Sequence, residues 1–147
     1  MRYWFPEKKV VGFDWLGKDI QGISIPATYW KDQAYIKKME RSLRADSVYK
    51  ARTSICDTAF ETRMSLLKSL GLQELINSRY VALTDAYYDC LAEKLKGSPY
   101  QYIPSFYAER NDSMRQNLRQ IIRHNRRKSV LIVTGADHYG YLRAVLK

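Results

Sequence analysis

Three residues in this sequence have side chains suited to chemistry at a shared site: Asp14, Arg110 and His138. A histidine can bind a metal through a neutral ring nitrogen or transfer a proton near neutral pH. An arginine can hold a carboxylate or a substrate anion with two parallel hydrogen bonds. These residue types predict a charged catalytic or binding site, provided that the fold brings them together.

Two apolar runs are expected to position Asp14 and His138. Residues 130–133 are continuously apolar and mostly β-branched, which is typical of a strand covered on both faces. A glycine turn then leads to His138. Residues 10–13 form a second run, which ends at Asp14. Sites in α/β folds collect at the carboxyl ends of strands, where both residues would lie if the two strands were parallel.

Arg110 lies near the start of a predicted helix over 105–124, at the edge of its apolar stripe. A helix that packs on a sheet and leads into a strand starts at the carboxyl edge of that sheet. An arginine beside an apolar stripe is not expected to be buried without a partner. We therefore expect Arg110 to meet Asp14 and His138, and Asn111 falls inside the same stripe.

The rest of the chain has helical periodicity. Two strands cannot form a sheet with both faces covered, so both apolar runs imply sheet partners from another segment or another chain. The predicted fold class is α/β: a single, mostly helical domain over 1–147, with four to five helices and two parallel strands of an incomplete central sheet. The predicted helices span 29–44, 47–70, 79–96 and 105–124, with further turns at 72–77 and a short helix from Tyr139.

Length and composition limit the class of protein. The chain has 147 residues, of which 46% are hydrophobic and 13% aromatic, so it is long and apolar enough for a folded core. No apolar run approaches the roughly 18 residues that span a bilayer. Cys56 and Cys90 lack the spacing of a zinc site, and we expect two buried thiols. Neither a phosphate-binding glycine loop nor a nucleophile elbow is present.

Each candidate also has a purely structural interpretation. His138 could be a hydrogen-bonded turn residue, Asp14 a turn acid, and the Arg110 side chain could extend from the stripe to water. The net charge of +10 and the basic stretch 115–128 permit nucleic-acid binding. A solvated helix face beside a basic loop explains that stretch as well, and no aromatic residue interleaves with it. We do not expect a nucleic-acid partner.

Two motifs resemble a known family. Arg110-Asn111-x-x-Met114, followed by an apolar strand that ends Gly135-Ala136-Asp137-His138, looks like the C-terminal signature of the TraB/PrgY/Tiki superfamily, which is related to erythromycin-esterase-like and ChaN-like proteins. The match covers about forty residues, from Glu109 to Lys147. On this resemblance the chain is a C-terminal portion of such a protein.

The resemblance implies a metal-dependent hydrolytic site. His138 would be a metal ligand or general base, Asp14 a second ligand, Arg110 a charge partner, and the metal Mn, Co or Zn. Three further residues would contribute to binding: Gly135, Asp137 and Asn111. The glutamates of the family's first-strand motif have no counterpart here, so the expected site is incomplete.

Two functions follow as expectations. One is a metal-dependent hydrolase site that lacks part of its ligand set and acts on an unidentified small molecule or peptide. The alternative is a non-catalytic ligand- or protein-binding module that self-associates, for example as a dimer, through an open sheet edge. The compartment is cytoplasmic if Met1 is the true start.

Overall fold

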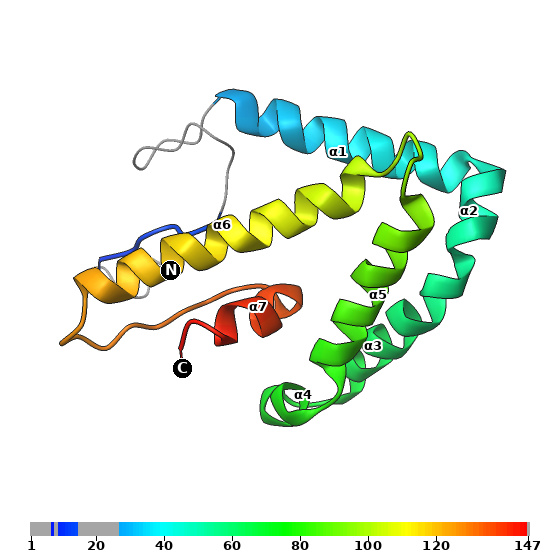
Figure 1. The fold of residues 1–147 in the computed structure, drawn as a ribbon. Coiled ribbons are helices and arrows are strands. Elements are labelled where there is room, and N and C mark those ends of the chain that lie inside the picture. The colour runs from blue at the N-terminus through cyan, green and yellow to red at the C-terminus, as the bar shows by residue number, and fades with distance from the viewer. Residues whose placement is uncertain (1–6, 8, 15–26, 147) are drawn as a thin grey trace.

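The computed structural model describes residues 7, 9–14 and 27–146, and all regular structure in this part is helical (Figure 1). In chain order the elements are α1 (Ala27–Ala45), α2 (Ser47–Thr53), the 3-10 turn η1 (Ser54–Cys56), α3 (Asp57–Ser69), α4 (Leu72–Asn77), α5 (Tyr80–Leu95), α6 (Tyr102–His124), the 3-10 turn η2 (Ala136–His138) and α7 (Tyr139–Arg143).

The helix boundaries follow local side-chain chemistry. Asp46 caps α2 by accepting hydrogen bonds from the backbone N–H groups of Val48 and Tyr49. The predicted helix over 47–70 is interrupted at η1, where the hydroxyls of Thr53 and Ser54 donate back to carbonyls of the preceding turn. Such bonds compete with the regular helical pattern, and the chain tightens there into a 3-10 turn.

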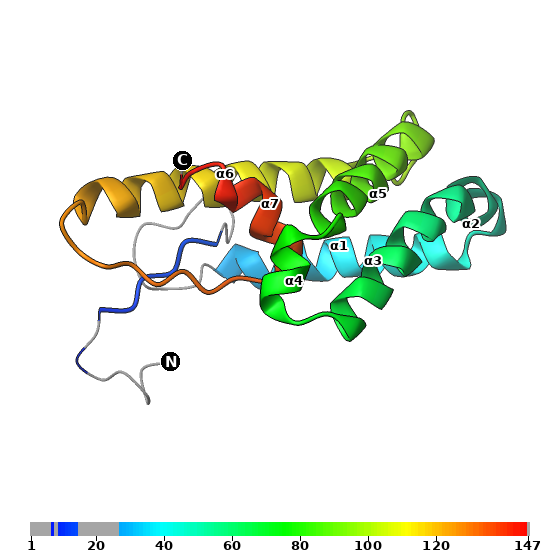
Figure 2. The ribbon, with the colours of Figure 1, turned by 90° about the horizontal axis from the view of Figure 1, so that it is seen from below.

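Two hydrophobic clusters hold the helices together. The first, centred on Cys56, Leu91 and Leu95, joins η1 to α5. Helices α3 and α5 pack along each other, with α4 connecting their ends (Figures 1 and 2). The second cluster lies on α6, where Met114 and Leu118 contact Leu142 of α7. Helix α1 lies beside the first turns of α6, where the Tyr107 hydroxyl donates to Glu40 (Figure 1).

The predicted α/β fold is wrong, because the part of the chain that the structure describes contains no strand. Residues 9–14 and 129–134 run without helical turns along α6, and Phe13 and Ile132 both pack on its cluster. No backbone hydrogen bond joins these two segments to each other within the described residues. An apolar, β-branched run forms a strand only when a neighbouring chain satisfies its backbone groups.

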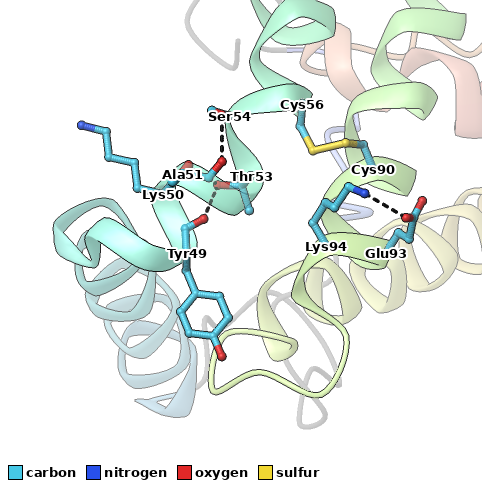
Figure 3. The surroundings of a disulfide bond; sticks show 9 residues. All are labelled: Tyr49, Lys50, Ala51, Thr53, Ser54, Cys56, Cys90, Glu93 and Lys94. Carbon is cyan, nitrogen blue, oxygen red and sulfur yellow. Dashed lines mark hydrogen bonds and ion pairs between the residues drawn. A yellow bond between two sulfur atoms is a disulfide. The ribbon is translucent and has the colours of Figure 1, made fainter.

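The expectation of two buried thiols is also wrong, because Cys56 and Cys90 form a disulfide (Figure 3). Their Cα atoms lie 5.7 Å apart, within the range that a disulfide spans. The bond links η1 to α5 and is covered by Leu91, Leu95 and Tyr49. It therefore connects two elements that are 34 residues apart in the sequence.

Removing this disulfide should destabilise the fold. Closing a loop of this length removes conformational entropy from the unfolded chain worth about 3 to 4 kcal/mol. We expect the double variant Cys56→Ser/Cys90→Ser to lose about that much free energy of unfolding in urea titration. Reduced wild-type protein is the control and should unfold at a similar urea concentration. Equal stability of the oxidised wild type and the variant would contradict the prediction.

Candidate functional site

Several charged and polar side chains meet where α3, α5, α6 and η2 approach one another, beside residue 14. We call this group the polar centre and define it by seven residues: Asp14, Arg63, Tyr80, Arg110, Asn111, Asp137 and His138. The group contains two arginine–aspartate ion pairs and one histidine–asparagine hydrogen bond.

The first ion pair joins Arg110 of α6 to Asp14. The arginine donates from Nε to Oδ1 at 2.9 Å and from Nη2 to Oδ2 at 2.5 Å, so both carboxylate oxygens are engaged. Two turns further along α6, the Asn117 amide donates to the carbonyl of Phe13 at 3.2 Å. These contacts fix residues 13 and 14 against the helix. Two parallel hydrogen bonds of this kind also set the orientation of both side chains.

His138 is held by Asn111, which is buried on α6. The His138 Nδ1 atom lies 2.6 Å from Asn111 Oδ1. Because that oxygen can only accept, Nδ1 donates, and the neutral ring carries its proton there and a lone pair on Nε2. Burial lowers the pKa of His138, and the nearby Arg110 lowers it further, against the opposing effect of the Asp14 and Asp137 carboxylates. The neutral ring is therefore the form that the fold favours at pH 7.

Asp137 forms the second ion pair, with Arg63 of α3. The Arg63 Nη1 atom lies 2.9 Å from Asp137 Oδ1, and the Tyr80 hydroxyl donates to the same oxygen at 2.5 Å. Arg63 is only 3% exposed. Its guanidinium carbon lies 5.0 to 5.9 Å from the centroids of three aromatic rings, which are those of Phe60, Tyr87 and Tyr88. The rings stabilise the buried cation, and the carboxylate of Asp137 balances its charge.

Sequence reasoning missed Arg63 and Tyr80. The signal for Arg63 was its place inside the apolar stripe of α3, between Phe60 and Met64, where a charge requires a partner. The structure inverts the expectation for this stripe, because Arg63 is buried while Phe60 and Leu67 remain partly exposed. No sequence pattern indicated that the partner would be Asp137, which lies more than seventy residues later.

Two glycines lie in the segment that carries Asp137 and His138, and one of them is required for close packing. The carbonyl of Gly135 accepts a hydrogen bond from the His138 N–H at 3.0 Å, which forms the turn that leads into η2. Gly140 lies in α7, where a Cβ atom would come within 2.5 Å of the Val81 side chain of α5. Helix α7 can therefore pack against α5 only because residue 140 has no side chain.

A side chain at position 140 should therefore disturb the polar centre. Val81 is stiff at χ1 and cannot easily turn aside, so Gly140→Ala should cost about 1 to 3 kcal/mol of unfolding free energy. The second change Val81→Ala in the same protein removes the clash and should restore part of that loss. Chemical denaturation of the two single variants and the double variant measures the coupling. Strictly additive losses would contradict a direct contact.

The structure brings Asp14, Arg110 and His138 together, although no sheet edge positions them within the residues it describes. Helix α6 supplies Arg110 and Asn111, and it also carries the apolar surface on which Phe13 and Ile132 pack. The roles expected for these residues in catalysis, binding or metal coordination stay predictions. The geometry shows which hydrogen bonds and ion pairs these side chains make.

The donor set in the described residues does not fit a resident divalent metal. Both oxygens of Asp14 bind Arg110, and Asp137 is paired with Arg63 and Tyr80. The lone pair on His138 Nε2 would be a single ligand. Nowhere in the described ranges do three or more histidine, cysteine, aspartate or glutamate residues form a group able to hold a metal ion.

Comparison with known proteins identifies no relative: no family model, no curated protein and no solved structure matches this chain. The resemblance to the TraB/PrgY/Tiki superfamily stays a prediction that rests on its motif residues. None of the helices in the described part is both long and apolar enough to cross a membrane.

The lowered pKa of His138 should make stability depend on pH. An unfolded chain, with the ordinary histidine pKa of 6.5, takes up a proton before the folded chain does. Unfolding free energy should therefore fall as pH drops below about 6.5. The variant His138→Gln should show a smaller fall between about pH 7 and pH 5. The variant His124→Gln, which removes the exposed second histidine, is the control for the loss of an imidazole. Equal slopes in all three proteins would contradict the assignment.

Proposed function

We propose that this protein is a non-catalytic protein-binding module, which contacts its partner through residues 129–134. We call Ser129–Thr134 the open segment. The polar centre serves this function by fixing the end of the segment: Asp137 and His138 follow it after two residues and are bound to α3, α5 and α6. The ion pairs argue against a hydrolytic site, because they engage the carboxylates that such a site requires.

One observation carries the proposal. Between Ser129 and Thr134 no backbone group makes a hydrogen bond to any described residue. The side chains of Val130, Leu131 and Val133 are 41%, 76% and 57% exposed, while Ile132 alone packs on the α6 cluster. An apolar segment with free backbone groups is a template for pairing with another extended chain. Pairing would satisfy the backbone and bury the exposed side chains together.

A second copy of this chain is the simplest partner, because it carries the same apolar segment. Two copies each bear a net charge of +10 and repel each other at low salt. Salt screens this repulsion, and the distance over which the charges repel falls to a few ångströms near 1 M. Pairing through apolar side chains and backbone hydrogen bonds should therefore strengthen as salt rises, whereas association through ion pairs would weaken.

Leu131→Pro tests the contact without disturbing the fold. Proline removes one backbone donor and the exposed leucine side chain, and the Leu131 N–H has no partner among the described residues. We expect wild-type protein to self-associate at about 0.5 M NaCl and the variant to remain monomeric, as measured by sedimentation equilibrium.

Leu72→Pro is the matched control. Leu72 is also 76% exposed, and it is the first residue of α4, where proline is well tolerated. This control should associate like the wild type. A wild-type protein that stays monomeric at every salt concentration would contradict the proposal, and so would a Leu131→Pro variant that associates as strongly as the control.

A further inference from the structure

The open segment lies next to the most basic part of the chain. From Ser113 to Ala136 the sequence contains no aspartate or glutamate, but it contains six cationic residues: Arg115, Arg119, Arg123, Arg126, Arg127 and Lys128. Arg115 pairs with Asp112 at 2.7 Å, whereas the other five are exposed. We call these five residues the basic flank. Its last three residues form the turn that leads directly into Ser129.

We propose that the occupant of the open segment is an extended apolar segment of another protein that is flanked by acidic residues. This inference rests on the proposed function. It adds the charge of the partner, and it makes self-association the weaker of the two interactions at physiological salt.

The backbone determines the class of partner. Free N–H and C=O groups that alternate along an extended chain are matched by another extended polypeptide, whose groups repeat at the same spacing. A phosphate polymer or a lipid surface has no such alternating donors and acceptors. The exposed side chains of Val130, Leu131 and Val133 require apolar side chains opposite them.

The basic flank determines the charge of that partner. A second copy brings five further cations toward the same region, and its net charge opposes the approach. An acidic partner is attracted over about 10 Å at 0.1 M salt and gains contacts with the arginines on arrival. Arginine also pairs with carboxylates in the two-bond geometry that Arg110 and Asp14 show within this protein.

Two synthetic peptides test the inference. Both contain the open segment's own sequence, SVLIVT, with three glutamates at each end of one and three lysines at each end of the other. Flanks at both ends make the test independent of strand direction. Fluorescence anisotropy of labelled peptides should give a Kd at least about tenfold lower for the glutamate peptide at about 50 mM NaCl. This difference should shrink at about 0.5 M NaCl.

Two charge-reversal variants distinguish the basic flank from net charge. Arg126→Glu/Arg127→Glu/Lys128→Glu should reverse the preference between the peptides. The control Lys38→Glu/Arg41→Glu/Lys50→Glu changes the net charge equally, at exposed positions on α1 and α2, and should preserve it. If both variants lose the preference equally, net charge alone is responsible and the inference is overturned.

Leu131→Pro distinguishes failure of the inference from failure of the proposed function. If both peptides bind with equal affinity and Leu131→Pro abolishes that binding, the open segment is still the contact and only the charge preference is overturned. Binding of the glutamate peptide that survives Leu131→Pro would be purely electrostatic and would overturn the inference. If neither peptide binds, both the inference and the proposed function are overturned.

Discussion

The burial of one arginine determines much of this structure. Arg63 lies in the interior of α3 against three aromatic rings, and a buried guanidinium is costly unless a carboxylate balances its charge. The carboxylate comes from Asp137, far along the sequence, with the Tyr80 hydroxyl on the same oxygen. This pairing draws η2 and α7 onto α3 and α5. It thereby fixes the point at which the open segment ends.

A second set of contacts fixes the other extended segment, which ends at Asp14, on α6. Arg110 holds Asp14, and Asn117 holds the carbonyl of Phe13, so residues 13 and 14 cannot slide along the helix. The result is a helical scaffold that carries two extended segments at defined places. The charged side chains that position these segments are engaged in ion pairs with one another. The polar centre is therefore better suited to anchoring than to catalysis.

The helices were largely predictable because their apolar periodicity and caps are local. The predicted helices over 79–96 and 105–124 correspond to α5 and α6 within a few residues. The two strands were predicted wrongly. A β-branched run indicates only that the segment could pair with an extended neighbour, and pairing depends on what lies beside it. The meeting of Asp14 and Arg110 was expected for a sheet that does not form in the described residues.

The Cys56–Cys90 bond and the Arg63–Asp137 pair could not be derived from sequence spacing, because each joins residues brought together only by tertiary packing. The first depends on the packing of η1 against α5, and the second on the approach of η2 to α3. Gly140 belongs to the same class. Its lack of a side chain matters only because Val81 of α5 lies opposite.

Amide hydrogen exchange within the open segment is the most direct test of the central claim, which is that its backbone is free in one molecule and satisfied by a partner. In low salt, the amides of residues 130–134 should exchange close to the rate of an unfolded chain, while those of α5 and α6 are protected. Under associating conditions alternate amides of 130–134, those that face the paired strand, should become protected, and those at the start of α4 should not change. Protection of 130–134 in the monomer, or its absence in the associated protein, would contradict the account.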